Sequence, residues 1–548
     1  VETPCCGNNS NEEFDFRFNY WGEDTTNEMN EGDNPKNISR IYDWWDTDGN
    51  HPMVNYAGWE GGSDEIGYTA DVMLTDSLWS DIGNEYPALT EDIYVEVYDP
   101  DESGSIEVEF TSDSDVDSET VVLHEVSEGL FRGSIPVENV GFELLSDEDR
   151  TRLLPRKINQ LKSIYPDLGD HDLERRAEYE LEKEAIARYE SGDMDNPGTR
   201  DDGILQIRAG DVIVVSYYDN LNDFGSEEEV ADQAVYGGWI GGVSGTWTAD
   251  NSPYVVTGDL YLNGDLTIEP GVEVLFFDNY SFRVYGSDGT LTAEGTETDS
   301  IYFKALNEGG VWDGLRLYQS GNHTLSYVDM SMSNNAALVS IESHDYGDIK
   351  INNSKFHNNS MAIQLYDLYS SEGSITIDSC EFNGNNTGTG IDGYDIFNQE
   401  LLHEGCPFLI TNSSITNYDT GLYLRYGSIC SEYNTITNND EGINLYEYHA
   451  NFDNIRFNYN NIHDNGWVDV YVGCCGESNE EFDFRFNYWG EDTTNEMNEG
   501  DNPKNISKIY DWWDHDGNSP MVNYAGWEGG SDEIGYTADI LLTDSDWN

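Results

Sequence analysis

ITNNDEGINLYEYHANFDNIRFNYNNIHDN, residues 436–465, contains the sequence period that decides the fold. An apolar residue, a polar residue and then Asn occur in ITNN at 436–439 and again in IHDN at 462–465. Related patterns precede them: MSNN (332–335), FHNN (356–359), FNGN (382–385) and ITN (415–417). The period that these positions define is too long for a hairpin meander and too rich in strand-forming residues for a helical solenoid. It predicts a parallel β-helix with three short strands per coil.

Each coil of such a fold buries its inward Ile, Leu, Val and Phe side chains only against the neighbouring coils. An Asn that recurs at one position is expected to stack, with each side-chain amide hydrogen-bonded to the next coil. Very short apolar segments from YVV (254–256) to IYF (301–303), separated by Gly, Asp and Asn, are typical of earlier coils. The sequence therefore predicts a parallel β-helix over residues 237–530.

One long stretch occurs twice. Residues 14–80 and 482–548 differ at 7 of 67 positions, so 60 are identical. The second copy follows the last Asn pattern by one more coil, which predicts that residues 482–530 are the last coil and C-terminal cap of the β-helix. We expect residues 1–79 to be the last coil and cap of a preceding repeat, and residues 531–548 to begin the next one. The chain would then be a window on a longer tandem array.

Each copy carries the aromatic segment IYDWWD, at 41–46 and 509–514. Covering the end of the β-helix is the interpretation that we favour, because an open end exposes unpaired backbone groups. Stacking against sugar rings is the alternative. The aromatic residues concerned are Tyr42, Trp44, Trp45, Tyr510, Trp512 and Trp513.

Residues 80–222 have a different pattern. Alternating segments such as DIYVEVYD (92–99) and SIEVEFTSD (105–113), with turn residues between them, predict antiparallel strands in an immunoglobulin-like β-sandwich. The polar, acidic residues 223–236 are expected to be a linker to the β-helix.

An insertion at about 145–195 is the strongly helical part of the chain. Ser146 followed by three acidic residues is a helix-start signal, and apolar residues then recur at helical spacing up to Ile164. The pattern predicts an α-helical hairpin that closes over the sandwich. The alternative is a docking surface for an acidic neighbour in an assembly, because basic residues gather here: Arg150, Arg152, Arg156, Lys157 and Lys162.

The charge balance is extreme, with 108 acidic and 25 basic residues and a net charge of −83. Such a chain repels nucleic acid and anionic membranes, so we expect neither as a partner. No apolar run approaches the ~18 residues of a membrane span. The acidic residues predict a solvated surface suited to salty water, and they are also compatible with shared divalent cations.

The seven cysteines show no zinc-ligand spacing. Cys406 and Cys430 are separated by the length of one coil, so they are disulfide candidates. Together with Cys380, which precedes Cys406 by a similar distance along the chain, they could instead be buried thiols. The remaining candidates, which could reach Cys430 or another chain, are Cys5, Cys6, Cys474 and Cys475. Disulfides fit an extracellular or cell-surface location.

Three short acidic turns place oxygen ligands at alternate positions around a tight turn, as calcium loops do. Calcium is the one cofactor that the sequence suggests, and plain Asp/Asn/Gly turns are the alternative. None of the turns has the distal Glu of a complete EF-hand loop. The candidate ligands are Asp46, Asp48, Asn50, Asp99, Asp101, Ser103, Asp514, Asp516 and Asn518.

Residues 245–305 (from GTWTADNSPYVV to IYFKA), WDGLRLY (312–318) and the NYWG and IYDWWD segments resemble right-handed parallel β-helix domains of secreted bacterial surface proteins. VYDPDESGSIEVEFTSD, GLFRGSIPV and DGILQIRAGDVIVVSYYD, within 92–219, resemble an immunoglobulin-like module that accompanies such proteins. The helical insertion departs from that pattern.

Some β-helix proteins are polysaccharide lyases or hydrolases. The Gly-His-Gly segment of polygalacturonase-type hydrolases is absent, and the acidic cluster GIDGYDIF (390–397) has no neighbouring His or basic residue. Basic residues are few and scattered: Arg283, Lys304, Arg316, Lys350, Lys355, Arg425 and Arg456. We therefore expect no enzyme, because the roles of a catalytic site are not placed together.

The fold class expected is predominantly all-β: a parallel β-helix plus an immunoglobulin-like sandwich that carries a helical hairpin. The function predicted is a structural repeat unit of an extracellular filament or cell-surface stalk, with copies of itself as partners. The alternative is an adhesin that binds extracellular polysaccharide, and a polysaccharide lyase or hydrolase is the third hypothesis.

Overall fold

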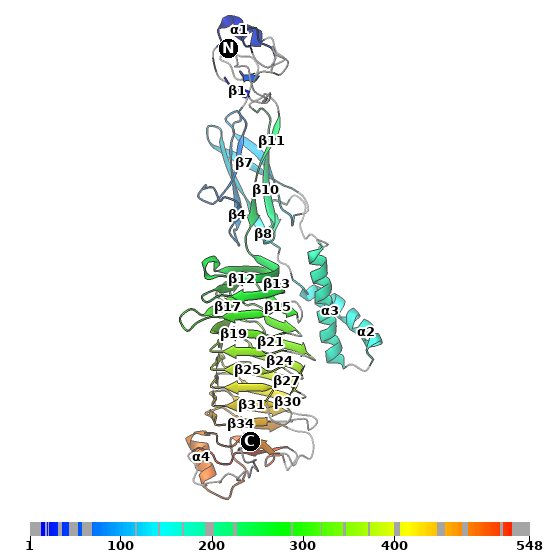
Figure 1. Cartoon of the computed structure of the whole chain (residues 1–548), viewed down its shortest axis with the longest axis vertical. Coiled ribbons are helices and arrows are strands. Elements are labelled where there is room, and N and C mark those ends of the chain that lie inside the picture. The colour runs from blue at the N-terminus through cyan, green and yellow to red at the C-terminus, as the bar shows by residue number, and fades with distance from the viewer. Residues whose placement is uncertain are drawn as a thin grey trace, which may run out of the picture. The chain divides into compact units, whose positions relative to one another are not determined.

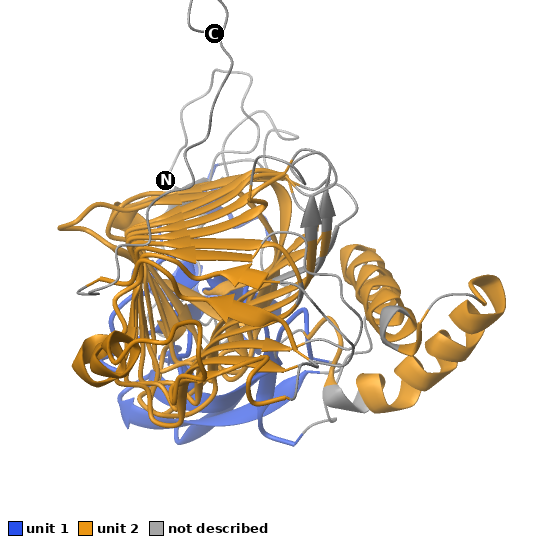
Figure 2. Ribbon diagram, turned by 90° about the horizontal axis from the view of Figure 1, so that it is seen from below, with its two compact units in different colours: residues 1–140, 194–237 blue, residues 141–193, 238–548 orange. Residues whose placement is uncertain are grey.

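The computed structural model describes residues 13–16, 19, 21–30, 36–42, 53–56, 68–115, 118–140, 143–166, 169–191, 202–222, 227–285, 289–318, 321–343, 347–370, 373–398, 406–446, 455–473, 481–515 and 519–528. The chain divides into two compact units, residues 1–140 with 194–237 and residues 141–193 with 238–548 (Figure 2). Strands dominate both, as expected. None of the described helices is long and apolar enough to cross a membrane.

The second unit contains a parallel sheet of 28 described strands, from β12 (Trp239–Trp247) to β39 (Met521–Asn523), coiled as a β-helix (Figure 1). After β13 (Tyr254–Ile268), a strand pairs with the strand three further along the chain, so three strands make one coil. Ile349 lies beside Ile375, and Ile375 lies beside Phe408 after a longer coil. The predicted parallel β-helix is confirmed, and its coils differ in length.

The strands stack in three faces. The first face holds β14 (Glu273–Phe276), β17 (Ile301–Ala305), β20 (Val328–Ser331), β23 (Lys355–His357), β26 (Glu381–Asn383), β29 (Ser414–Thr416), β32 (Thr435–Thr437) and β35 (Asn461–His463). The second holds β15 (Ser281–Tyr285), β18 (Gly314–Tyr318), β21 (Ala336–Ser343), β24 (Met361–Ser370), β27 (Thr389–Asn398), β30 (Thr420–Gly427), β33 (Glu441–Tyr446), β36 (Val468–Gly473) and β38 (Ile509–Tyr510). The third holds β16 (Leu291–Glu294), β19 (His323–Ser326), β22 (Ile349–Asn352), β25 (Ile375–Asp378), β28 (Phe408–Thr411), β31 (Ile429–Glu432), β34 (Ile455–Asn458), β37 (Glu481–Asp483) and β39.

The interior of the β-helix is a column of apolar side chains. Phe356 stacks on Phe382 of the next coil with ring centroids 5.0 Å apart, and both are fully buried. Full burial of a side chain of this size contributes about 1.5–3 kcal/mol. The turns are held by the expected asparagine ladder: the backbone N–H of Asn434 donates to Oδ1 of Asn460 (2.9 Å) one coil later.

The first unit contains a largely antiparallel sheet in the order β3-β5-β8-β7-β6-β10-β11-β4, with β9 paired to β8. Its strands are β3 (Asp71–Thr75), β4 (Glu85–Tyr86), β5 (Asp92–Tyr98), β6 (Ser105–Thr111), β7 (Glu119–Ser127), β8 (Leu130–Asn139), β9 (Leu205–Ile207), β10 (Val212–Asp219) and β11 (Glu228–Tyr236). A separate antiparallel domain is therefore confirmed.

Two predicted boundaries of this domain are wrong. Residues 223–236 are not simply a linker, because β11 pairs with β10 along its whole length and buries Ala234 and Tyr236. The domain also begins before residue 80, because β3 lies within the repeated stretch and pairs with β5. Glu228 and Asp232, on the same side of β11 as Ala234 and Tyr236, concealed its alternating pattern.

The insertion forms the predicted helical hairpin, α2 (Asp147–Ile164) and α3 (Asp170–Glu190). Ser146 caps α2 by accepting a hydrogen bond from the backbone N–H of Asp149 (3.2 Å). The hairpin is not part of the compact unit of the antiparallel domain that it interrupts in sequence. It belongs to the unit of the β-helix, where Tyr179 of α3 packs edge-on against Tyr285 of β15 (5.8 Å).

The two copies of the repeated stretch fold alike where both are described. In the first copy, β1 (Glu13–Asp15) pairs in parallel with β2 (Met53–Asn55), as β37 pairs with β39 in the second. The helix α1 (Glu23–Met29) corresponds to α4 (Gly490–Asn498). A short 3-10 turn, η2 (Ala249–Asn251), lies outside both copies, between β12 and β13. The expected start of a next repeat, residues 531–548, lies outside the described residues.

Candidate functional sites

The second copy of the repeated stretch packs against the last coil of the β-helix and covers its apolar interior. The ring of Phe484 stacks on Phe457 of the preceding coil with centroids 4.7 Å apart, and Trp489 is 0 % exposed. Strand β38 continues the second face by pairing Ile509 with Val470. Among the described residues, 481–528 cover the last paired coil of the β-helix, and we call residues 481–528 the cap.

Asn487 is the last rung of the asparagine ladder. Its Oδ1 accepts a hydrogen bond from the backbone N–H of Asn460 (2.7 Å), and its Nδ2 donates to the carbonyl oxygens of Phe457 (2.8 Å) and Phe484 (2.7 Å). The side chain thus satisfies buried backbone groups on two coils, which would each cost about 1–3 kcal/mol if left unpaired.

Lys508 joins the cap to the preceding coil. Its Nζ donates to the carbonyl oxygens of Asn465 (2.8 Å) and Gly466 (3.0 Å), and its own carbonyl accepts from the backbone N–H of Asp469 (2.9 Å). Burial raises the pKa of the Asp469 carboxyl to about 6. Burial likewise raises the pKa of Asp511, within the cap, to about 6. The junction therefore contains carboxyls that titrate near pH 6.

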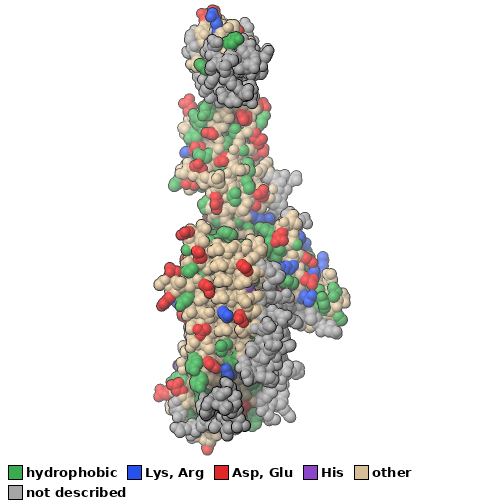
Figure 3. Space-filling view, viewed as in Figure 1, with side chains coloured by type: hydrophobic (Ala, Val, Ile, Leu, Met, Phe, Trp, Pro, Cys, Tyr) green, Lys and Arg blue, Asp and Glu red, His purple; other side chains and the backbone are tan. Residues whose placement is uncertain are grey.

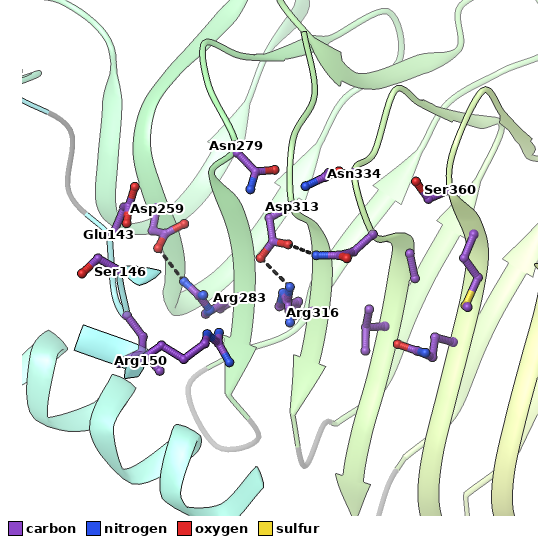
Figure 4. A pocket seen from close by; sticks show the side chains of 16 residues that line it. Glu143, Ser146, Arg150, Asp259, Asn279, Arg283, Asp313, Arg316, Asn334 and Ser360 are labelled. Atoms are coloured by element: carbon purple, nitrogen blue, oxygen red, sulfur yellow. Dashed lines mark hydrogen bonds and ion pairs between the residues drawn. The ribbon is translucent and has the colours of Figure 1, made fainter. Parts of the chain in front are cut away.

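A second candidate site is a groove of about 800 Å³ between the start of the hairpin and the second face of the β-helix (Figure 4). The first turns of α2 line one side with Arg150, and successive coils supply Arg283, Arg316 and Gln364. The amides of Asn279 and Asn334 lie above the arginines in Figure 4.

Buried ion pairs hold the arginines of the groove in place. Arg283 Nη1 lies 2.7 Å from Asp259 Oδ2, and its Nε lies 3.3 Å from Glu182 of α3. Asp259 also accepts a hydrogen bond from the backbone N–H of Leu144 (2.7 Å), which fixes the entry to the hairpin. Arg316 pairs with Asp313 in the next coil. These carboxylates keep the pKa of both arginines above its ordinary value.

The sequence concealed this cluster because its residues are scattered along the chain. Arg283 and Arg316 are well separated in sequence, yet they are directly paired neighbours on β15 and β18. Their separation by about one coil is the sequence feature from which the contact between the two arginines could have been predicted. No sequence pattern marks the acidic partners of these arginines, which are Asp259, Asp313 and Glu182. Glu182 reaches Arg283 only because the hairpin packs against the β-helix.

The groove places charged and amide groups side by side. Its inner carboxylates, Asp259 and Asp313, are each engaged by a guanidinium group. Guanidinium, amide and carboxylate groups side by side offer donors and acceptors together, which is the chemistry that recognises hydroxyl groups or a sugar carboxylate.

Of the predicted calcium ligands, Asp99, Asp101, Ser103 and Asp514 lie in the part of the chain that the structure describes. Asp99 is 1 % exposed, and its carboxylate accepts hydrogen bonds from Tyr217 Oη (2.7 Å) and the backbone N–H of Asp101 (3.0 Å). Asp514 accepts from Asn505 Nδ2 (3.0 Å). Among the described residues, no group of three or more His, Cys, Asp or Glu side chains is placed to hold a metal ion. The other candidates are the described Ser103 and residues outside the described ranges: Asp46, Asp48, Asn50, Asp516 and Asn518.

Cys406 and Cys430 form a disulfide on adjacent coils, with Cα atoms 5.7 Å apart. The bridge excludes the alternative of three buried thiols, and Cys380 keeps a buried thiol. The other disulfide candidates lie outside the described residues: Cys5, Cys6, Cys474 and Cys475.

Most of the basic residues predicted for assembly contacts pair within the hairpin itself. Lys157 lies 2.6 Å from Glu184, and Lys162 lies 2.7 Å from Asp170. Arg150 pairs with Glu178 and Arg152 with Asp149, whereas Arg156 is exposed. Figure 3 shows blue side chains gathered over the hairpin among red ones. The basic island therefore largely neutralises acidic residues of α3.

No protein-family model and no curated protein matches this chain.

Proposed function

We propose that this chain is a structural repeat unit of an extracellular filament or cell-surface stalk, assembled from copies of itself in tandem or end to end. The observation that carries the proposal is a cap that occurs twice. Residues 14–80 and 482–548 are nearly identical, and their described parts fold alike. A single globular protein needs one cap per β-helix, whereas a linear array needs one for each repeat.

The remaining features support an extracellular, load-bearing role. The disulfide between Cys406 and Cys430 is typical of oxidising compartments. A β-helix and an antiparallel domain are both continuous hydrogen-bonded structures, and they agree with the resemblance to secreted bacterial surface proteins that have an immunoglobulin-like module. The partner we propose is another copy of the same period.

Mass spectrometry and negative-stain microscopy of the native material test this proposal together. We expect regular fibres, and the intact mass decides between one tandem polypeptide and separate subunits. Native material that consists of single, unassociated chains under all solution conditions would contradict the proposal.

A glycan-binding role is a second candidate, and the groove favours it. The exposed rings of Tyr433 and Tyr459 are less suited, because they stack on each other at 5.4 Å, and Tyr459 also stacks on Phe486 at 5.3 Å, so that their faces are covered. We therefore place the candidate glycan site at Arg316. A glycan array should show binding that Arg316→Ala removes and that Arg456→Ala, outside the groove, leaves unchanged. Absence of binding to every glycan would exclude this candidate.

A further inference from the structure

The chain contains nine N-x-S/T sequons, the acceptor pattern of N-linked glycosylation. Glycan transfer needs access to two groups, the Asn amide and the hydroxyl of the Ser or Thr two residues later, so the fold decides which sequons can serve. The first of the nine lies outside the described residues, and the other eight are described. The sequons begin at Asn8, Asn37, Asn279, Asn322, Asn352, Asn358, Asn385, Asn412 and Asn505.

In three of the described sequons the side-chain amide of the Asn is held by the fold. Asn412 Nδ2 donates to Asp378 Oδ1 (2.7 Å) in the preceding coil. Asn358 Nδ2 lies 3.0 Å from Nδ1 of the His that precedes it. Asn322 Oδ1 accepts a backbone N–H of the next coil (2.8 Å). These amides already serve as structural hydrogen-bonding groups of the β-helix turns.

In four others the hydroxyl is engaged. Ser281 and Ser354 are 0 % and 1 % exposed, and they donate to Asp259 (2.8 Å) and to the carbonyl of the sequon Asn (2.8 Å). In the two copies of the duplicated stretch, Ser39 and Ser507 each donate to a Glu carboxylate, at 2.5 and 2.6 Å. The fold therefore withholds one of the two required groups in seven of the eight described sequons.

The sequon Asn385-Asn386-Thr387 differs, because all three of its residues are exposed. Within the part of the chain that the structure describes, neither the Asn385 amide nor the Thr387 hydroxyl makes a hydrogen bond. The turn between β26 and β27 that carries them is fixed from behind, since the backbone N–H groups of Gly384 and Asn386 donate to carbonyls of the next coil (3.0 and 2.7 Å). Both required groups are thus presented to solvent on an anchored turn.

A groove of about 300 Å³ on the first face of the β-helix is bordered by the same Asn385. Its lining includes Lys355, His357 and Glu381, whose ammonium, imidazole and carboxylate groups can donate to or accept from sugar hydroxyls. Lys355 and Glu381 form only a loose pair, 3.8 Å apart, and both side chains are more than half exposed. Such a pair contributes little to the fold and can bind a sugar instead.

We propose that Asn385 is the attachment site of an N-linked glycan, with the first sugar lying in this groove. In the transfer, Asn385 Nδ2 forms a bond to the anomeric carbon of a lipid-phosphate-linked oligosaccharide. The bond from that carbon to the phosphate oxygen breaks, the lipid phosphate leaves, and the amide nitrogen loses a proton. This inference rests on the extracellular location in the proposed function, because the transfer accompanies export, and it does not depend on assembly into filaments.

Mass spectrometry of the native material tests the inference with an internal control. Cleavage after Glu gives peptide 382–400, whose one sequon is at Asn385, and peptide 405–432, whose one sequon is at Asn412. Most of peptide 382–400 should be heavier by the mass of an oligosaccharide, whereas peptide 405–432 should have its unmodified mass. A peptide 382–400 found only at its unmodified mass would overturn the inference, and so would equal modification of both peptides.

Two variants produced in the native host identify the acceptor atom. Asn385→Gln should abolish the mass shift, whereas Asn386→Gln, which leaves the sequon intact, should retain it. Both substitutions change exposed side chains, so the thermal midpoint of the unglycosylated protein should stay the same in each. A shift that survives in Asn385→Gln would place the sugar on another residue, such as the Thr387 hydroxyl, and would refute the proposed site.

The same material separates this inference from the proposed function. Fibres whose subunits lack the mass shift would refute the glycan site and leave the filament standing. Single, unassociated chains that carry the shift at Asn385 would support the glycan site and refute the filament.

Discussion

Replacing Asn460 by Ala should destabilise the β-helix by removing one rung of the asparagine ladder. Its Oδ1 accepts the backbone N–H of Asn434 (2.9 Å), and its Nδ2 donates to the carbonyl of Ser431 (2.8 Å). Asn434 and Ser431 are 0 % and 1 % exposed, so water does not replace the lost partner. Two buried backbone groups left unpaired cost about 1–3 kcal/mol each, which gives about 2–6 kcal/mol for Asn460→Ala.

Urea unfolding followed by tryptophan fluorescence measures this loss as a lower midpoint, and hydrogen exchange at the Asn434 amide localises it. Exchange at that amide should accelerate by at least about 30-fold, the equivalent of about 2 kcal/mol. Asn461→Ala is the matched control, because the neighbouring Asn461 is exposed and should change stability by no more than about 0.5 kcal/mol. Equal effects of the two substitutions would refute the ladder as a source of stability.

Three further predictions concern the junction, the disulfide and calcium. Burial raises the pKa of Asp469 and Asp511 from an ordinary 3.8 to about 6, so the cap should be most stable below about pH 4 and should lose stability as the pH rises to about 6. In urea unfolding, Asp469→Asn should reduce this pH-dependent loss in the free energy of unfolding by roughly 2–3 kcal/mol. An unchanged pH profile would contradict the assignment. Reducing the bridge between Cys406 and Cys430, which closes a 24-residue separation, should cost about 3 kcal/mol in the same assay, and reductant should have no effect on a Cys430→Ser variant. Calcium should leave the thermal midpoint of the antiparallel domain unchanged, because a calcium site needs six to eight oxygen ligands; a rise that Asp101→Asn abolishes would show that a site forms there.

The sequence was sufficient to predict the β-helix because the same constraint acts on every coil. Inward apolar residues and turn asparagines must align from coil to coil, so the period is visible even where an insertion lengthens a coil, as between Ile375 and Phe408. The second copy could be placed as a cap for the same reason, since Asn487 continues the series of rungs. The disulfide between Cys406 and Cys430 followed from a spacing of one coil.

Features that depend on contacts between distant elements were missed. The hairpin interrupts the antiparallel domain in sequence, and only buried partners such as Glu182 and Arg283 show that it packs on the β-helix. Strand β11 was mistaken for a linker because Glu228 and Asp232 lie on the same side of the strand as Ala234 and Tyr236, and they interrupt its apolar alternation. The groove forms where the hairpin packs against the β-helix, so no local sequence motif could predict it.

The central claim is that the duplicated stretch caps successive β-helices in a linear array, and a cryo-electron-microscopy map of the native assembly tests it most directly. We predict an axial repeat that contains one antiparallel domain and one β-helix, with the first copy of the duplicated stretch covering the end of the β-helix before it. A map in which the first copy of the duplicated stretch does not cover the end of a β-helix would contradict the account.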